Sequence, residues 1–416
     1  MEKTIIKKII LENQERIPNL KIFKRCYEVN TSANYIFTGQ RRSGKTYLMY
    51  WIIKQMPKDG VSIEKILYIN FEDERLLELT TSDLSLIIES YKELYNEQPI
   101  IFFDEVQNID GWQKFVRRLS DSDYRIYITG SNAQMLSSEM ASALGGRFMV
   151  KEIETLSFSE YLHFSGIELD KNYEYSSQRY EIQKIFETFF NYGGFPELFK
   201  FSNKKEYLSN IFQKVFLGDI IARQQIRNNH PLKLMVKKLA ESTTDEVSYT
   251  RIKNIINSIG VNVGTATLIE YLKYLEDAYL IRTLSNFNAK ISERETKKKY
   301  YFRDNGLLGL FLMEPEAFLL ETLVCNVLCA RFKDNVFYIR NVYEIDFYVP
   351  NEQLVQVSYS LNNYDTRKRE TTALLKASES YKSKNLLIVT YNEEEIIEID
   401  GKTINVVPVW KWVLGV

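Results

Sequence analysis

The chain has 416 residues, a formal net charge of −1, 45% hydrophobic residues and 26% charged residues. This length predicts two to four domains, because a domain usually runs to about 100–200 residues. The composition is that of an ordinary globular protein. The near-neutral balance argues against a protein that coats nucleic acid over its whole surface, although a local basic face remains compatible with it.

The cysteines and histidines do not indicate a metal site. Cys26, Cys325 and Cys329 form neither a disulfide framework nor a metal-binding spacing, and His163 and His230 lie far apart in the sequence. The first residues lack the apolar core of a signal peptide. No stretch reaches the ~18 uninterrupted apolar residues of a spanning helix. We therefore expect a protein of the reducing cytoplasm with no membrane partner.

The first part of the chain predicts an α/β fold. Residues 2–27 carry Ile and Leu at helical spacing and predict one or two helices. Between residues 34 and 153, short apolar runs alternate with helical stretches, as in a sheet of buried parallel strands. The runs lie at residues 35–37, 66–69, 100–103, 126–128 and 148–150.

A phosphate-binding motif follows the first of these strands. It matches G-x-x-x-x-G-K-[ST] at every fixed position, through Gly39, Gln40, Arg41, Arg42, Ser43, Gly44, Lys45 and Thr46. In such a loop, backbone amides and a helix N-terminus surround the phosphates. Lys45 would reach the β- and γ-phosphates and Thr46 would bind magnesium. The motif therefore predicts binding of ATP and Mg²⁺.

Two acids end the third predicted strand. Asp104 and Glu105 directly follow the apolar run 100–103. Carboxylates at the end of a buried strand are costly unless they meet a cation. Asp104 fits the acid that holds magnesium through water, and Glu105 is placed to polarise the attacking water. Their presence after a phosphate loop favours hydrolysis of ATP over binding alone.

Three further positions are candidates for the same site. Ser131 or Asn132, after the strand at residues 126–128, would orient the lytic water or sense the γ-phosphate; the sequence does not choose between them. Arg147 is either an arginine finger, acting within the chain or across a subunit interface, or an arginine that ties its loop down. Glu72, after the second strand, is a weaker candidate for the site.

The middle of the chain predicts helices followed by a winged helix. Residues 156–230 are helical and aromatic, interrupted at 193–196, and form a lid or linker. A helix starts at Ser248, and a second, capped by Thr265, spans residues 266–277. Residues 279–282 and 299–302 predict the wing. The second helix exposes Glu270 and Glu276, whose charge would repel phosphates, so protein docking is as compatible with this pattern as DNA binding.

At this point the chain resembles the prokaryotic AAA-type P-loop ATPases described as archaeal-ATPase-like, which carry a C-terminal domain of unknown function. The matching segments occur in family order at residues 37–46, 68–76, 103–108, 129–132, 146–147, 156–161, 193–197 and 344–347. The resemblance implies an ATPase core, a winged-helix region and a restriction-endonuclease-like domain of the PD-(D/E)xK type. The biological role of this family is largely unassigned.

The resemblance implies a nuclease-like site in the last domain, and the residues depart from it at one position. Glu321, Asp346 and Gln356 match the metal-binding acids and the polar strand residue in order. Such nucleases also use a lysine, expected two residues after Gln356, where this chain has Ser358. The departure favours a degenerate, non-catalytic domain, unless Arg367 or Lys368 replaces the lysine. An α/β domain with incidental acids is the remaining alternative.

These observations predict four parts: an AAA-type ATPase domain at residues 1–155, a helical region at 156–230, a winged helix at 231–312, and a nuclease-like α/β domain at 313–416. The predicted function is an ATP-driven switch that couples nucleotide state to the C-terminal half and acts on DNA. The alternatives are an ATP-regulated protein-interaction module and an ATP-licensed, metal-dependent nuclease. A homo-oligomer is compatible with all three.

Overall fold

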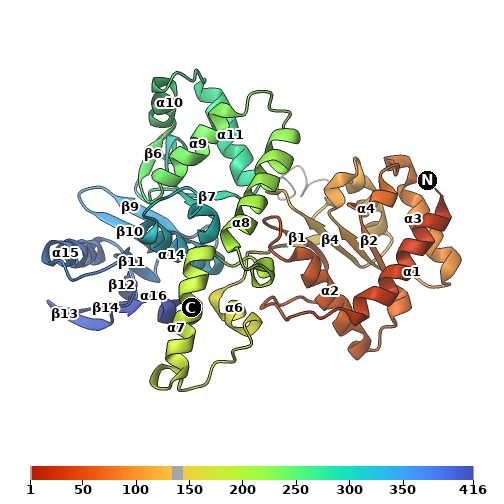
Figure 1. Cartoon of the computed structure of the whole chain (residues 1–416), viewed down its shortest axis with the longest axis horizontal. Coiled ribbons are helices and arrows are strands. Elements are labelled where there is room, and N and C mark those ends of the chain that lie inside the picture. Colours follow the sequence, from red (N-terminus) through yellow and green to blue (C-terminus); the bar gives the residue numbers. More distant parts are fainter. Residues whose placement is uncertain (1, 134–143, 416) are drawn as a thin grey trace. The chain divides into compact units, whose positions relative to one another are not determined.

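The computed structural model describes residues 2–133 and 144–415. The chain divides into two compact units, Met1–Glu154 and Thr155–Val416. Within the described residues, every helix is too short or too polar to cross a membrane. Each unit is built around its own sheets and cores, and Figure 1 traces both along the chain.

The first unit contains a five-stranded parallel sheet in the order β2-β3-β4-β1-β5. Its strands are β1 (Asn34–Thr38), β2 (Ile66–Asn70), β3 (Ile100–Asp104), β4 (Ile126–Gly130) and β5 (Phe148–Glu152). All five were expected from the sequence. Parallel strands bring their carboxyl ends to one edge, so the chemistry-bearing residues that follow β1, β3 and β4 meet there.

Helices cover both faces of this sheet (Figure 1). They are α1 (Lys3–Asn19), α2 (Lys45–Gln55), α3 (Leu84–Leu94) and α4 (Trp112–Asp121). Alternate residues of each strand serve different faces. Leu67 and Ile101 pack in a core with side chains of α1, α3 and α4, whereas Tyr68 and Phe102 pack in a second core with side chains of α2. Burial on both faces explains why the strands are apolar throughout.

The second unit begins with helices. They are α6 (Phe158–Phe164), α7 (Gln178–Tyr192), α8 (Lys204–Gln213) and a π-helical segment, η9 (Lys214–Ala222). The glycine pair after α7 is explained by one buried carboxylate. Asp304 Oδ2 accepts a hydrogen bond from Gly194 N at 2.9 Å, and a Cβ on Gly193 would lie 1.9 Å from Asp304 Oδ1.

The helices and the hairpin expected in the middle of the chain are present in the predicted order. They are α9 (His230–Glu241), β6 (Glu246–Ser248), α10 (Tyr249–Ser258), α11 (Thr265–Asp277), β7 (Ile281–Leu284), α12 (Ile291–Thr296) and β8 (Lys297–Phe302). β7 pairs with β8 antiparallel, and β6 completes a three-stranded sheet, β6-β8-β7. The cap of α11 is Gly264, and Thr265 is the first helical residue.

Two details of this segment differ from the sequence-based expectation. β6 is only three residues long and was not predicted. Glu276 is not free to face a phosphate, because its Oε1 accepts a hydrogen bond from Thr283 Oγ1 at 2.8 Å. Glu270 is exposed, as expected.

The end of the chain forms a six-stranded mixed sheet in the order β13-β14-β12-β11-β10-β9. Its strands are β9 (Phe337–Arg340), β10 (Glu344–Val349), β11 (Gln353–Val357), β12 (Asn385–Thr390), β13 (Glu395–Ile399) and β14 (Lys402–Pro408). The helices of this part are α13 (Asn305–Leu308), α14 (Glu316–Phe332), α15 (Tyr364–Ser380) and α16 (Val409–Gly415). Leu354 packs with side chains of α15, and the next residue, Val355, packs with side chains of α14.

Candidate functional site

The phosphate loop connects β1 to α2 through backbone conformations that glycine permits. Gly39 has φ +140°, and a Cβ there would lie 2.2 Å from the carbonyl oxygen of Ile153. Gly44 has φ +100° and directly precedes the first turn of α2. Both positions therefore require glycine. The result is a tight loop at the N-terminus of a helix, where amides and the helix dipole favour an anion.

The side chains of the loop are buried polar groups. Lys45 is 4% exposed, and its Nζ donates to the carbonyl oxygens of Gly39 and Gln40 at 3.1 and 3.0 Å. Gln40 Nε2 and Ser43 Oγ are buried and have no hydrogen-bond partner among the described residues. Buried donors without partners are rare, since each costs about 1–3 kcal/mol. A bound phosphate would supply the missing acceptors.

Asp104 lies beside Thr46, as magnesium ligation requires. Thr46 Oγ1 donates to Asp104 Oδ2 at 2.9 Å, and Tyr68 Oη donates to the same oxygen at 2.7 Å. Thr129 Oγ1 donates to the other oxygen. Burial and the neighbouring Glu105 raise the pKa of Asp104, while these three hydroxyl donors act in the opposite direction. A hydroxyl and a carboxylate are oxygen donors of the kind that Mg²⁺ prefers.

Glu105 follows in a left-handed conformation, φ +51°, and its side chain lies next to the phosphate loop. Its Oε1 lies 4.0 Å from Lys45 Nζ, and its Oε2 accepts from Gln107 Nε2 at 2.5 Å. Burial acts to raise the pKa of Glu105, but Lys45, Gln107 and Arg41 outweigh it and lower that pKa. The carboxylate is therefore ionised at neutral pH, as a group that polarises water must be.

The structure places three of the weaker candidates in or beside this centre. Ser131 is 1% exposed, and its Oγ accepts from Gln107 Nε2 at 3.4 Å, so it shares a donor with Glu105. Asn132 is also buried, at 7% exposure. Glu72 Oε1 pairs with Arg41 of the phosphate loop at 2.5 Å, which places Glu72 at the edge of the site.

Arg147 lies elsewhere on the first unit. Its guanidinium pairs with Asp121 Oδ1, at the end of α4, at 2.6 Å, and its side chain is 37% exposed. It therefore lies at the surface, where it holds the loop before β5 against α4. This geometry is compatible with an arginine that ties its loop down and with one that is offered to another subunit.

Among the residues that hold the site together, Tyr68 and Arg25 were not expected from the sequence. Tyr68 carries the hydroxyl that supports Asp104; the only signal was a tyrosine within an aliphatic strand. Arg25 is 3% exposed, and its guanidinium donates to the carbonyl oxygens of Ser43 and Glu154 at 2.8 and 2.9 Å. It lies in a segment without regular structure, and no local pattern marks it.

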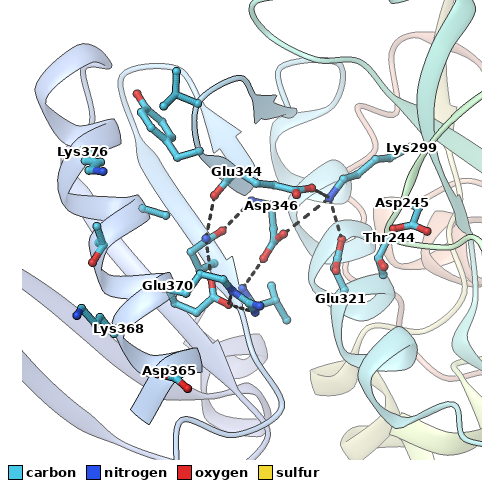
Figure 2. A pocket seen from close by; sticks show the side chains of 17 residues that line it. Thr244, Asp245, Lys299, Glu321, Glu344, Asp346, Asp365, Lys368, Glu370 and Lys376 are labelled. Carbon is cyan, nitrogen blue, oxygen red and sulfur yellow. Dashed lines mark hydrogen bonds and ion pairs between the residues drawn. The ribbon is translucent and has the colours of Figure 1, made fainter. Parts of the chain in front are cut away.

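The second unit contains a separate cluster of charged residues in a cavity of about 730 Å³. Glu321 of α14 and Asp346 of β10 line it (Figure 2), together with Gln356 of β11. Gln356 Oε1 accepts from Asp346 N at 2.8 Å, and Gln356 Nε2 donates to Glu370 Oε2 at 2.7 Å. Ser358 Oγ instead donates to the carbonyl oxygen of Ser360.

The cation that reaches these acids is neither Arg367 nor Lys368. Arg367 pairs with Glu395 at 2.7 Å, and Lys368 lies over the ring of Tyr364. Lys299 of β8 contacts the cluster instead, with its Nζ 3.5 Å from Glu321, 3.2 Å from Glu344 and 3.8 Å from Asp346 (Figure 2). Lys299 was expected only as the first residue of the predicted wing at 299–302, without a role in this cluster. Alternation along β8 distinguishes Lys299 from its neighbour Lys298, since Lys299 shares a face with the buried Tyr301.

Burial dominates the electrostatics of this cluster. It raises the pKa of Glu321 to about 8, although Lys299 and the hydroxyl of Tyr301 act to lower it. The described residues contain no group of three or more His, Cys, Asp or Glu that could hold a metal ion.

A glycine-containing phosphate loop at the end of β1, with Thr46 and Asp104 hydrogen-bonded and β4 between β1 and β3, defines a P-loop ATPase of the AAA type. Residues 31–162 match the family described as an AAA domain, and residues 183–316 match a family described as a domain of unknown function.

Whole-chain relatives define the family further. An uncharacterised protein of Methanocaldococcus jannaschii is 35% identical over 99% of this chain and 96% of its own length. One of Haemophilus influenzae is 31% identical over 91% of this chain and 94% of its own length. The chain belongs to the family of AAA-domain proteins that these two represent. Among solved structures, the Walker-type ATPase of Pyrococcus abyssi is similar at 12% identity and a TM-score of 0.40, over 74% of this chain and 95% of that one.

Proposed function

We propose that the chain binds Mg-ATP at the carboxyl edge of the five-stranded sheet and hydrolyses it, and that the nucleotide state switches the C-terminal half. The observation that carries this proposal is the contact between Thr46 and Asp104, with Glu105 ionised beside Lys45. This is a metal-binding pair, a phosphate-binding cation and a base within one buried cluster. Such a set serves hydrolysis rather than binding alone.

Each residue of the set has a distinct role in the proposal. Amides of the loop, with Gln40 and Ser43, hold the phosphates, and Lys45 neutralises their charge. Thr46 and Asp104 would hold Mg²⁺, which supplies charge stabilisation to the phosphates. Glu105 accepts a proton from the attacking water. Ser131 positions that water together with Gln107, because both side chains belong to the hydrogen-bonded network around Glu105.

Phosphate release and ATP binding, measured on the same preparations, test the proposal. Lys45→Ala should abolish turnover. Glu105→Gln should retain ATP binding and lose about 10²–10⁴-fold in turnover, the usual contribution of a general base. Lys58→Ala, on the exposed surface after α2, is the matched control and should behave as wild type. Normal turnover of Glu105→Gln would mean that the base is another residue.

Two alanine variants test whether Ser131 or Asn132 positions the attacking water. We expect Ser131→Ala to lower turnover more than Asn132→Ala does, with ATP affinity unchanged in both variants. The reason is that Ser131 shares the donor Gln107 with Glu105. The reverse order of effects would transfer the role to Asn132.

The surface of α11 favours a protein over DNA as the partner of the proposed switch. Its exposed face presents Glu270 and Lys273, whose charges offset each other, and the apolar Ile269, which is 43% exposed. An acid on this face would repel phosphates, whereas an exposed aliphatic side chain suits a protein contact. We therefore propose that the winged-helix part, β6 to β8, docks a protein. Action on DNA is the alternative.

A gel-shift experiment over a salt series separates these two partners. Protein docking predicts no shift of duplex DNA at low salt, with or without a non-hydrolysable ATP analogue. Binding that weakens steeply as salt rises would identify a DNA-binding protein instead. Plasmid nicking in Mg²⁺ or Mn²⁺ with ATP, lost on Asp346→Ala, would identify a nuclease.

A further inference from the structure

The cavity of the second unit contains acids in the order of a metal-dependent nuclease, but its central cation is part of the chain. Glu321, Glu344 and Asp346 direct carboxylate oxygens at one point, and the ammonium of Lys299 lies at that point (Figure 2). We propose that the ammonium of Lys299 occupies the position that a divalent metal ion would take in such a cluster, so that the cavity binds no metal ion. This inference does not depend on the proposed ATPase activity.

The contacts of Lys299 argue for a permanent occupant. Its side chain is 1% exposed, so the ammonium has almost no access to water. Three carboxylate oxygens lie within 4 Å of Nζ, and the ring of Tyr338 lies beneath it at 5.5 Å. A buried ammonium is tolerated only where anions compensate it. Moving Lys299 out of the cluster would leave the converging acids without their compensating cation.

The same contacts argue against a metal. Carboxylates repel one another when they converge, and either a divalent cation or an ammonium can relieve that repulsion. The two cannot share one position, because they also repel each other. The remaining coordination capacity is reduced as well: Asp346 Oδ2 accepts from Val357 N at 2.8 Å, and Glu321 Oε1 accepts from Tyr301 Oη at 2.6 Å.

Lys299 also connects two parts of the second unit. It comes from β8 of the three-stranded sheet, whereas Glu344 and Asp346 come from β10 of the six-stranded sheet and Glu321 comes from α14. One ammonium thus links the winged-helix part to the last sheet. In a metal-dependent nuclease the cation is exchangeable, but here it is covalently attached to the neighbouring part.

Manganese binding to the nucleotide-free full chain, followed by electron paramagnetic resonance, tests the inference in the natural sequence. Wild type and Glu344→Gln should bind the same number of Mn²⁺ ions with the same affinity. An additional ion that is bound by wild type and lost in Glu344→Gln would overturn the inference. This comparison does not require any change at Lys299.

Removal of the ammonium should uncover the metal site. Lys299→Met keeps the length of the side chain and should bind one Mn²⁺ ion more than wild type, with a melting temperature that Mn²⁺ raises by several degrees. The double variant Lys299→Met, Glu344→Gln should lose that ion. Lys298→Met is the matched control, since Lys298 lies on the opposite face of β8 and pairs with Glu295; it should gain nothing. A folded Lys299→Met that gains no ion would also overturn the inference.

Discussion

A single hydroxyl group in a buried strand supports Asp104, the acid that we propose binds magnesium. Tyr68 is the only polar side chain among the first four residues of β2, and its hydroxyl donates to Asp104. Tyr50 Oη lies 3.1 Å from the same hydroxyl, and Arg16 in turn donates to Tyr50 Oη at 2.9 Å. These bonds orient the carboxylate whose other contacts come from Thr46 and Thr129.

Removal of that hydroxyl should weaken the metal site without unfolding the sheet. One hydrogen bond contributes about 0.5–1.5 kcal/mol, so we expect Tyr68→Phe to lower turnover about fivefold at limiting Mg²⁺ and to recover at saturating Mg²⁺. A steady-state Mg²⁺ titration measures this. Tyr127→Phe is the control, because Tyr127 shares the same core but its hydroxyl bonds, among the described residues, only to the carbonyl oxygen of Thr31, at 3.4 Å. Equal effects of both changes would contradict the role of Tyr68.

Asp304 should make the stability of the second unit depend on pH. Burial raises its pKa to about 6, although the amides of Gly194 and Gly306 act to lower it. An acid with a raised pKa in the folded state stabilises the fold below its unfolded pKa of about 4, and the contribution is lost as pH rises through about 6. The loss over this window is about 3 kcal/mol, from ~2 pKa units at ~1.4 kcal/mol each.

Urea unfolding at pH 4 and pH 7 measures this contribution. The free energy of unfolding of wild type relative to Asp304→Asn should fall by that amount between the two pH values, because asparagine does not titrate. Parallel pH dependences of the two proteins would show that Asp304 keeps its ordinary pKa.

At the scale of elements, the periodicity of apolar residues predicted the strands that are buried on both faces. It did not predict the strand and the side-chain contact whose partners lie far away in the sequence. The five parallel strands and the phosphate loop follow from local pattern, since apolar runs and glycine positions are visible in a few residues. The short strand β6 pairs with β8, about fifty residues away, and no local signal announces it. Lys299 was missed for the same reason: its partners lie on α14 and β10, and only the fold joins them.

The turn after α7 requires glycine at position 193, and the sequence alone did not show why. Gly193 has φ +75°, and its missing Cβ leaves room for the carboxylate of Asp304. Gly193→Ala should therefore combine backbone strain with a steric clash and destabilise the second unit by about 3 kcal/mol or more.

Gly166→Ala is the matched control for this prediction. Gly166 has φ +82°, but a Cβ added there would meet no described heavy atom within 4 Å, so the change should cost only the ~1–2 kcal/mol of left-handed strain. Thermal unfolding of both variants separates the two contributions. Similar losses in melting temperature would show that Asp304 yields to the added methyl group.

At the scale of the whole molecule, the role of Arg147 determines whether one chain is sufficient for the proposed ATP turnover. We expect it to act on a neighbouring subunit, because it lies at the surface and contacts only Asp121 among the interactions described. Turnover per chain should then rise with protein concentration, and Arg147→Ala should lose at least tenfold.

Asp121→Ala distinguishes this role from that of a structural tie. It breaks the same exposed ion pair, which is worth about 0–1 kcal/mol, while leaving the arginine in place, and should retain most of the turnover. Equal losses in the two variants, with specific activity flat across dilution, would mean that Arg147 only fastens its loop.

The larger hydrophobic core of the second unit has members from Leu156 to Val413. It includes side chains of the helical region, of the segment from β6 to β8 and of the last sheet. A gene fusion or recombination event that exchanged only the final ~100 residues would therefore expose half of a core, however well the borrowed sheet folded. These three parts share one core and are expected to be inherited together, whereas recombination at the junction between residues 154 and 155 would leave that core intact.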